Sequence, residues 1–455
     1  MKKYITIIII AIGLLSCTKE EKNPNIIFLL TDDQRWDAIG YSGNPLINTP
    51  NIDKLAEQGV IFENAYVTTS ICCVSRASIL SGQYASRHGI HDFHTDFSDS
   101  AMLQTYPLLM KEKAGYQIGF IGKYGIGLKG HPKEKFDYWG CEKVHQPKYE
   151  NFDSAGNMQH YTDIVNGRIT ECLQQFSENG PFCLSVSFKA PHVEDRDPRQ
   201  FIYHERYSED YQDMFFSRPE HGKQENWDRF SAEFRKNNEA RKRWKIRFET
   251  DSLLRESVRG YYRLIQGVDD VVGNITQQLN DLGIADNTII VFMGDNGFFL
   301  GEHGMAGKWY PYNESVRVPL FIYNPKAAEE IKGSRIDKMA LNIDIAPTLL
   351  QYAGVEIPEN MQGEALQNSW NSANSWRDYF FYEHRLPNPR IPKSEAIIGL
   401  DYKYIEYYEL PDSNLEFYDL TADKQEVVNL GECPEHIDLV TDYKDKLDSL
   451  RIAVK

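Results

Sequence analysis

Two continuous apolar runs, far apart in the sequence, constrain the fold of this 455-residue chain most strongly. Residues 25–30 (Asn-Ile-Ile-Phe-Leu-Leu) are followed by Thr31-Asp32-Asp33, and residues 288–293 (Thr-Ile-Ile-Val-Phe-Met) by Gly294-Asp295-Asn296. Neither run alternates between apolar and polar residues, which is typical of a strand that is buried on both faces of a parallel sheet. Because ligands bind in the crevice beyond the carboxyl ends of such strands, we expect both acidic clusters to lie in one crevice.

The rest of the first 355 residues alternates between strand-like and helix-like segments. Shorter apolar runs occupy residues 118–121, 182–188 and 319–323. Helix-like stretches occupy residues 51–58, 107–114 and 261–282. This alternation predicts an α/β fold with a doubly wound, mostly parallel sheet and helices on both faces.

The pattern changes after about Gly354, which places the domain boundary there. We predict a main domain over residues 24–355 and a small C-terminal α+β domain over residues 356–455. The second domain has Tyr-rich alternating segments, typical of an antiparallel sheet, and a terminal helix. These segments lie at residues 379–383 and 403–408, and the helix at 436–451.

One stretch of the main domain, residues 194–257, is heavily charged and aromatic, with little apolar periodicity. Its residues 230–248 predict a basic, exposed helix. We interpret the stretch as an insertion over one edge of the crevice. It is either a solvated helix pair or a lid over a substrate.

Composition excludes several classes of protein. With 41% hydrophobic and 25% charged residues the chain is typical of a folded globular protein. The 66 Asp and Glu residues outnumber the 50 Lys and Arg residues, which argues against a nucleic-acid partner, because phosphate contacts need a basic face. Seven cysteines in this length do not make a disulfide scaffold.

The N-terminus predicts export. Two lysines precede an apolar run at residues 5–15 that is too short to span a bilayer, so we predict a signal peptide over residues 1–16. The ending Leu14-Leu15-Ser16-Cys17 resembles a bacterial lipobox, which implies that Cys17 becomes a lipid anchor in the membrane. The alternative is an ordinary signal peptide with an incidental cysteine.

Residues 17–23 would then be a charged, lipidated tether. Their acidic character also resembles a signal for export to the outer cell surface. We expect a bacterial outer-membrane lipoprotein, either on the cell surface or facing the periplasm.

The densest motif is residues 71–82 (Ile-Cys-Cys-Val-Ser-Arg-Ala-Ser-Ile-Leu-Ser-Gly). Together with the acidic clusters, it resembles the type I sulfatases of the alkaline phosphatase superfamily. Its amino-acid sequence resembles in particular that of the carbohydrate sulfatases, such as the N-acetylglucosamine-6-sulfatases. The family's proline position holds Val74 here. The resemblance implies that a formylglycine-generating maturation enzyme oxidises Cys72 to formylglycine (3-oxoalanine). Alone, Cys72 would more often be a buried cysteine or a disulfide partner.

The resemblance also implies a metal site. The residues that match the family's ligands are Asp32, Asp33, Asp295 and Asn296, with the modified Cys72 beside them. Oxygen donors of this kind suit a hard cation, Ca²⁺ or alternatively Mg²⁺. Alone, either Asp pair would more often be a helix cap or a turn.

Three further motifs match catalytic residues of the family. Lys123 and Lys308, together with Arg76, are expected to bind the sulfate oxygens, and His192 to protonate the leaving alcohol. Where the family has a second histidine, two residues after Lys123, this chain has Gly125. The role of that histidine is left to His88, to His91 or to a water.

These matches imply hydrolysis of sulfate esters on carbohydrates. We expect exo-acting desulfation of a glycan or glycosaminoglycan, at the 4-O or 6-O position of a galactose-, GalNAc- or GlcNAc-type sugar, with release of inorganic sulfate. Candidate substrate contacts on the rim of the crevice are His94, His303, Arg317, His384 and Arg385. Two alternatives are a phosphatase or phosphodiesterase of the same superfamily and a non-catalytic, glycan-binding surface lipoprotein.

Overall fold

The computed structural model describes residues 23–128, 131–370, 375–410 and 414–455. The predicted signal peptide and the predicted lipid anchor at Cys17 lie outside these residues. A search of the described helices for one that is long and apolar enough to cross a membrane finds none.

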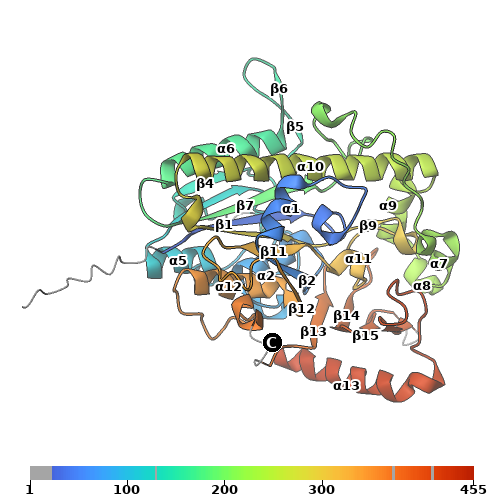
Figure 1. Cartoon of the computed structure of the whole chain (residues 1–455). Helices are drawn as coiled ribbons and strands as arrows, with labels where there is room; N and C mark the ends of the chain where they lie inside the picture. The colour runs from blue at the N-terminus through green and yellow to red at the C-terminus, as the bar shows by residue number, and fades with distance from the viewer. Residues whose placement is uncertain (1–22, 129–130, 371–374, 411–413) are drawn as a thin grey trace, which may run out of the picture.

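An eight-stranded sheet forms the centre of the molecule (Figure 1). In spatial order its strands are β12 (Ser334–Leu341), β2 (Val60–Tyr66), β11 (Leu320–Tyr323), β8 (Thr288–Gly294), β1 (Asn25–Asp32), β7 (Phe182–Pro191), β3 (Gln117–Gly122) and β4 (Tyr138–Cys141). All neighbours pair in parallel except β11, which is antiparallel to both β8 and β2. The prediction of a mostly parallel sheet is therefore confirmed.

The two apolar runs are the adjacent central strands β1 and β8. They pair in register from Asn25 with Thr288 to Thr31 with Gly294. Successive side chains of β1 enter opposite cores: Ile26 and Phe28 pack on one side of the sheet, Ile27 and Leu29 on the other. Every residue of both strands is buried, which explains why neither run alternates with polar residues.

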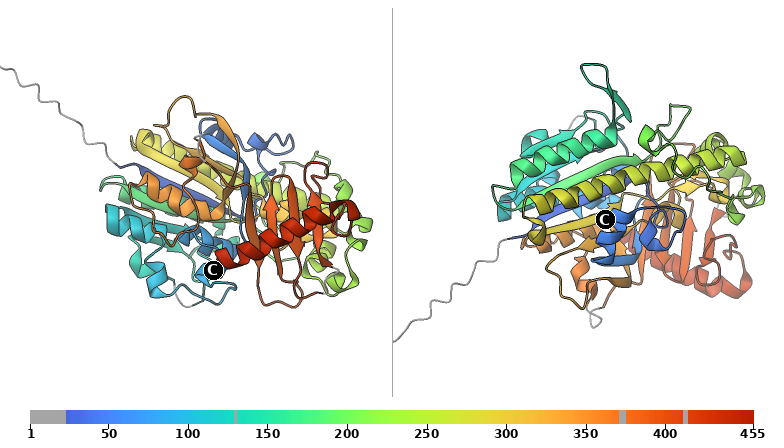
Figure 2. Two further views of the ribbon diagram at one scale, coloured as in Figure 1. Left: turned by 90° about the horizontal axis from the view of Figure 1, so that it is seen from below. Right: turned by 45° about the horizontal axis from the view of Figure 1, so that its top comes forward.

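Helices cover both faces of the sheet, as predicted (Figures 1 and 2). Those on one face are α1 (Pro50–Glu57), α6 (Tyr161–Phe176) and α10 (Asp251–Asp281). Those on the other are α2 (Cys72–Ser81), α5 (Tyr106–Ala114) and α12 (Ile345–Tyr352). Helix α10 begins ten residues before the predicted start, because the Thr250 side chain accepts a hydrogen bond from the Leu253 amide and caps it.

The C-terminal part forms the predicted antiparallel sheet. Its strands are β13 (Tyr379–His384), β14 (Ser394–Gly399), β15 (Tyr402–Glu406) and β16 (Glu416–Asp419), in that spatial order. Helix α13 (Ile437–Ala453) lies across this sheet and buries Val440 and Leu447 (Figure 2). The Glu383 amide donates to the Thr68 carbonyl at 3.0 Å, so strand β13 is joined to the segment that leads into α2.

The prediction of one basic, exposed helix over residues 230–248 is wrong. The insertion instead contains α7 (Gln224–Asp228), α8 (Ala232–Arg235) and α9 (Glu239–Arg247). Phe230 and Phe234 are buried and stack at 4.6 Å, and the Asn238 side chain that caps α9 also donates to the Tyr310 hydroxyl. Aromatic side chains therefore pack this segment against the loop near Tyr310, although its charged residues suggested that it would be exposed to solvent.

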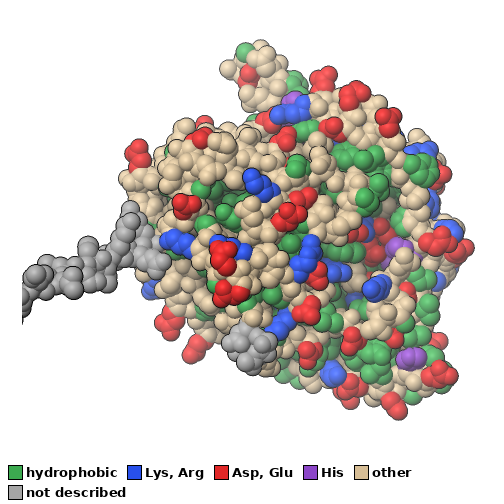
Figure 3. Space-filling view, in the orientation of Figure 1, with side chains coloured by type: hydrophobic (Ala, Val, Ile, Leu, Met, Phe, Trp, Pro, Cys, Tyr) green, Lys and Arg blue, Asp and Glu red, His purple; other side chains and the backbone are tan. Residues whose placement is uncertain are grey.

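Apart from short 3-10 helices, the remaining described helices and strands are also short. They are α3 (Ala85–His88), α4 (Asp99–Met102), α11 (Asn313–Val316), the pair β9 (Phe299–Leu300) and β10 (Ala306–Gly307), and the hairpin β5 (Glu150–Phe152) and β6 (Met158–His160). The hairpin β5–β6 projects from the body of the molecule (Figure 1). On the face shown in Figure 3, acidic and basic side chains of the described residues are interspersed.

His88 ends α3 and is packed against α2. Its Nε2 lies 3.0 Å from the Ser78 hydroxyl, and its Nδ1 accepts a hydrogen bond from the Ile90 amide at 3.1 Å. Burial, with the nearby positive charge of His91, lowers the pKa of His88 to about 3. The folded protein therefore holds this imidazole neutral at a pH where the unfolded chain protonates it.

We predict that His88 makes the protein acid-sensitive. Between pH 6.5 and pH 3 the unfolded state binds a proton that the folded state does not, so stability falls as the pH falls. At pH 5 this amounts to about 2 kcal/mol. Urea unfolding at pH 7 and pH 5 should show a smaller pH effect for His88→Gln than for wild type. The exposed His94→Gln should keep the wild-type difference, and an unchanged difference in His88→Gln would refute the assignment.

Candidate active site

The two acidic clusters meet at the carboxyl ends of β1 and β8. Asp32 ends β1, and Asp33 follows it with a positive φ of 67°, a left-handed conformation that Asp tolerates better than most residues. The Asp33 amide donates to Asp295 Oδ1 at 3.1 Å, and Asn296 Nδ2 donates to Asp33 Oδ1 at 2.6 Å. The prediction that the two clusters lie together at the strand ends is confirmed.

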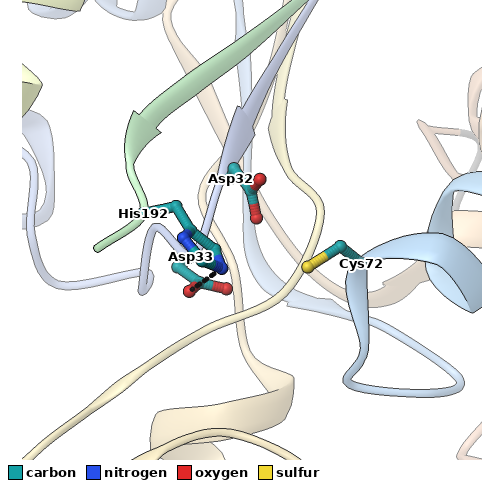
Figure 4. A group of neighbouring side chains, drawn as sticks. All are labelled: Asp32, Asp33, Cys72 and His192. Atoms are coloured by element: carbon teal, nitrogen blue, oxygen red, sulfur yellow. Dashed lines mark ion pairs between the residues drawn. The ribbon is translucent and has the colours of Figure 1, made fainter. Parts of the chain in front are cut away.

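Cys72 is the first residue of the buried helix α2, and its side chain faces the two acidic clusters. Figure 4 shows its sulfur pointing toward the side chains of Asp32, Asp33 and His192. Ligand atoms of these four residues all lie within 4.8 Å of one another. One turn along the helix, Arg76 Nε donates to Asp295 Oδ2 at 3.0 Å, so α2 supplies both the cysteine and a cation.

A chain of hydroxyl groups fixes the start of α2. The Ser315 hydroxyl donates to the Ser70 hydroxyl at 2.8 Å, and Ser70 lies 2.9 Å from the Tyr382 hydroxyl. Tyr382 in turn donates to the Trp309 carbonyl at 2.6 Å. The chain joins the residues before Cys72 to the C-terminal sheet and to the loop that carries Lys308.

Buried positive charges balance the carboxylates. Lys123 donates to Asp32, Lys308 donates to Asp33, and Lys308 Nζ lies 2.8 Å from the Cys72 sulfur. Burial alone would raise the pKa of Asp32, but the charges of Lys123, His192 and Arg76 lower it well below its usual range. The site therefore keeps an ionised carboxylate beside the cations Arg76, Lys123 and Lys308.

The donor set also fits a hard divalent cation. Asp32 Oδ1 and Asn296 Oδ1 are buried and have no hydrogen-bond partner, which leaves two oxygens free to coordinate an ion. Burial and the charge of Asp32 raise the pKa of Asp295, and a cation shared by these carboxylates would relieve that repulsion. The residues that could hold it are Asp32, Asp33, Asp295 and Asn296, with the side chain at position 72.

His192 stands at the end of β7, beside Asp33. Its Nδ1 lies 2.6 Å from the Val193 carbonyl, and its Nε2 lies 3.5 Å from Asp33 Oδ2, the pair marked in Figure 4. Burial lowers the pKa of His192 to about 4. The structure thus brings Cys72, His192 and the metal-ligand candidates together, as expected from the motifs.

Gly125 leaves little room for a side chain. It has a φ of 74°, and a Cβ built there would lie 3.3 Å from Arg76 Cδ and from Lys123 Cε. The two histidines expected as substitutes for the missing one differ in their surroundings: both nitrogens of His88 are engaged as described above, and the pKa of His91 is lowered by burial and by the charge of Arg385. The imidazole that hydrogen-bonds to the Gly125 backbone is His145, for which the sequence had no motif.

The five candidate substrate residues are scattered. His94 is exposed, and its amide donates to Asp92. The Arg385 guanidinium pairs with Glu383 and Glu395 at 3.0 and 2.7 Å. Arg317 donates to the Glu63 carbonyl and lies 5.2 Å from the Trp36 ring, at a separate surface hollow.

The other two candidates are not on the rim. His384 is fully buried, neither of its nitrogens has a hydrogen-bond partner, and burial lowers its pKa to about 3. His303 is also fully buried. These positions correct the expectation that both line the crevice mouth.

His303 belongs to a second buried cluster instead. Arg229 Nη2 lies 3.1 Å from His303 Nδ1, and because arginine only donates, that Nδ1 is the acceptor. The hydrogen of His303 is then on Nε2, 3.6 Å from Glu314 Oε2, while His221 Nε2 lies 3.2 Å from Glu314 Oε1. A nitrogen that carries hydrogen cannot bind a metal, so we interpret the cluster as a hydrogen-bond network that holds the loop carrying Lys308.

We predict that Glu314→Gln destabilises the protein by about 2–3 kcal/mol, because an amide N–H₂ would face the N–H of a histidine inside the core. The matched control is Glu63→Gln, which removes an exposed carboxylate and its ion pair with Arg335 and should cost less than about 1 kcal/mol. Urea unfolding measures both. Equal effects in the two variants would contradict the network.

Comparisons with known proteins identify the family. A family model described as Sulfatase matches residues 24–355, and one described as N-sulphoglucosamine sulphohydrolase, C-terminal, matches residues 301–453. An N-acetylglucosamine-6-O-sulfatase of Bacteroides thetaiotaomicron is 30% identical over 92% of this chain and 85% of its own length. An arylsulfatase of Clostridium perfringens is 28% identical over 94% and 93%.

Solved structures agree with this match. The protein BT4656, solved in complex with its substrate D-glucosamine-2-N,6-O-disulfate, superposes with a TM-score of 0.81 at 27% identity and covers 95% of this chain and 98% of its own. A phosphonate monoester hydrolase of Silicibacter pomeroyi, at 20% identity and a TM-score of 0.80 over 95% and 96%, shares the fold. The chain belongs to the sulfatase family.

Proposed function

We propose that this sulfatase removes the 6-O-sulfate from a glucosamine-type sugar at the end of a glycan or glycosaminoglycan chain. The observation that carries the proposal is the 30% identity, over most of the chain, to an N-acetylglucosamine-6-O-sulfatase. The human N-acetylglucosamine-6-sulfatase, 25% identical over 92% of this chain, points the same way, as does the disulfated glucosamine bound to BT4656. Among the sugars and positions expected from the sequence, these relatives favour GlcNAc and 6-O.

Three cations would hold the sulfate. Lys308 Nζ contacts the Cys72 sulfur directly, Lys123 pairs with Asp32, and Arg76 donates to the Lys123 carbonyl. Donors fixed in a buried site stabilise charge that builds on the sulfuryl oxygens better than water does, because they need no reorganisation. These residues also bind the ground-state anion in an otherwise acidic protein.

The surroundings of position 72 favour a modified residue over an unmodified cysteine. Burial and the charge of Asp32 raise the pKa of the Cys72 thiol to about 12, so the unmodified side chain is not a thiolate nucleophile. Formylglycine at this position is an aldehyde that takes up water to give a geminal diol: one hydroxyl would attack sulfur, and the other would then lose its proton and expel sulfate as the aldehyde reforms. Lys308 and Arg76 would orient the group at position 72 toward the ester.

Calcium is the cation that we propose for the oxygen cage of Asp32, Asp33, Asp295 and Asn296. When bound there, it supplies Lewis-acid stabilisation to the sulfuryl oxygens and to the attacking hydroxyl. Asp33 and Asp32 would then give up part of their present pairing with Lys308 and Lys123. Those two ammonium groups become available to the substrate.

We assign to His192 the protonation of the leaving sugar oxygen. Its Nδ1–H is engaged by the Val193 carbonyl, so its Nε2 is the nitrogen that faces the crevice. Nε2 carries a hydrogen only when the imidazole is protonated, and from that state the Nε2 proton can pass to the sugar oxygen as the bond between that oxygen and sulfur breaks. Sugars are poor leaving groups, so this transfer matters more for them than for activated aryl esters.

The lipoprotein assignment is part of the proposal. It rests on the sequence alone: the signal peptide over residues 1–16, Cys17 and the tether that follows. Neither alternative function, a phosphatase or a non-catalytic glycan-binding protein, is favoured by a specific observation, since the phosphonate monoester hydrolases share only the fold at about the 20% identity given above.

We predict that enzyme with formylglycine at position 72, checked by peptide mass, releases sulfate from N-acetylglucosamine-6-sulfate but not from its 3-O-sulfated isomer or from galactose-4-sulfate. Cys72→Ser should lose more than about a thousandfold in kcat, because serine lacks the second hydroxyl. Cys73→Ser, one residue along the same helix, is the matched control and should stay active. Sulfate release from galactose-4-sulfate alone would overturn the sugar assignment. Full activity of Cys72→Ser would overturn the formylglycine mechanism.

We also predict that Ca²⁺ stabilises chelator-treated protein. A ligand at a hundred times its Kd adds about 2.7 kcal/mol to the free energy of unfolding, which is visible as a higher Tm. Asn296→Ala should reduce this shift, because it removes a buried oxygen donor, whereas Asn157→Ala in the exposed hairpin should not. The same titration with Mg²⁺ tests the alternative cation, and an equal or larger shift with Mg²⁺ would contradict calcium.

A further inference from the structure

The loop between β4 and β5, residues 142–149, brings the side chain of Gln146 against the imidazole of His192. Gln146 Nε2 lies 3.1 Å from His192 Nε2. The Gln146 side chain is exposed on its other side, whereas His192 is buried. The amide therefore sits between the imidazole and solvent, where a substrate has to enter.

The loop is fastened to the strand that carries His192. The Tyr149 hydroxyl donates to the His192 carbonyl at 2.7 Å, and the Tyr149 amide donates to Glu194 Oε2 at 3.0 Å. Lys189 Nζ pairs with Glu194 at 2.8 Å and lies 3.8 Å from the centre of the Tyr149 ring. These contacts fix the backbone three residues from Gln146, so its position relative to His192 is set by the fold.

Hydrogen-bond chemistry assigns the donor and the acceptor in the contact. The Val193 carbonyl can only accept, so the Nδ1 that lies 2.6 Å from it carries the hydrogen of the neutral imidazole. His192 Nε2 is then a lone-pair acceptor, and the amide of Gln146 is its donor. The glutamine thereby holds the nitrogen that the reaction uses.

We propose that Gln146 positions His192 in the free enzyme and, once substrate is bound, donates its amide hydrogen bond to a hydroxyl of the leaving sugar. The proposal rests on the function proposed above. The leaving oxygen must approach His192 Nε2, so the amide that occupies this place is the group it displaces. A sugar presents hydroxyls next to the ester oxygen, and a displaced amide within reach of them can bind them. A simple aryl ester has no such hydroxyl.

The first test compares two substrates. For Gln146→Ala, kcat/KM on the sugar sulfate should fall about tenfold, while kcat/KM on 4-nitrophenyl sulfate should change less than about threefold. Gln146→Glu keeps the shape of the side chain but removes the N–H donor, and should show the same selective loss. Lys143→Ala, an exposed position in the same loop, is the matched control and should behave as wild type on both substrates.

Three results would overturn the proposal: equal loss on both substrates, no loss on either, or wild-type kinetics in Gln146→Glu. Thermal unfolding of each variant shows whether an equal loss comes from a damaged fold. Wild-type turnover of the sugar sulfate is measured in the same assay. Its failure would show that the substrate assignment is wrong without bearing on Gln146, which the second test decides independently.

The second test needs neither substrate nor formylglycine. Diethyl pyrocarbonate acylates the free lone pair of an imidazole, and peptide mass spectrometry reports the rate at His192 separately from the other histidines. Without the Gln146 donor, that rate should rise about fivefold in Gln146→Ala and stay unchanged in Lys143→Ala. An unchanged rate in Gln146→Ala would show that the amide does not hold His192 Nε2, and would overturn the proposal.

Discussion

Mutual neutralisation of six buried charges at the carboxyl edge of the central sheet is the constraint on which the rest of the structure depends. The carboxylates are Asp32, Asp33 and Asp295, and the cations are Arg76, Lys123 and Lys308. Removing one partner of such a set leaves an uncompensated buried charge, which costs about 3–5 kcal/mol. The six come from five different segments, so all of them are compensated only when the strands β1, β3 and β8, the helix α2 and the loop after β10 have assembled.

The same charge balance means that the site can bind an anion only after some of these ion pairs have been weakened. As the side chains stand, each cation is paired with a carboxylate, and the site has no excess positive charge to offer a sulfate ester. The divalent cation proposed above would change this: Asp32 and Asn296, each with a buried oxygen that has no hydrogen-bond partner, would help to hold it, and the two lysines would be released from part of their pairing. With the ion bound, the local charge would be positive inside a chain whose net charge is −16, and the resulting field would attract an anionic substrate to this site.

The fold and the site could be predicted where one local pattern has one physical cause. β1 and β8 were identified because burial on both faces leaves an unbroken apolar run, and strand ends in a parallel sheet bring Asp32 and Asp295 together. Strand β12 was not predicted, because its first half is partly exposed and its pattern is mixed. His303 and His384 were misplaced for a related reason: the sequence gives the position of a histidine along the chain but not its packing. His303 is enclosed with Arg229, 74 residues away, and His384 is the last residue of the buried part of strand β13.

Gln146 shows a different limit, set by the chemistry of the reaction. Every sulfate ester presents the same charged group, so the residues that we propose to hold it lie in recognisable motifs around Cys72, Lys123 and Lys308. The leaving alcohol differs between substrates, and the loops that face it have no common pattern to recognise. Only the contacts of Tyr149 with the His192 strand show that the glutamine three residues earlier has a fixed place at the imidazole. Specificity for the sugar is therefore to be sought in the loops around His192, and the chemistry in the strand ends.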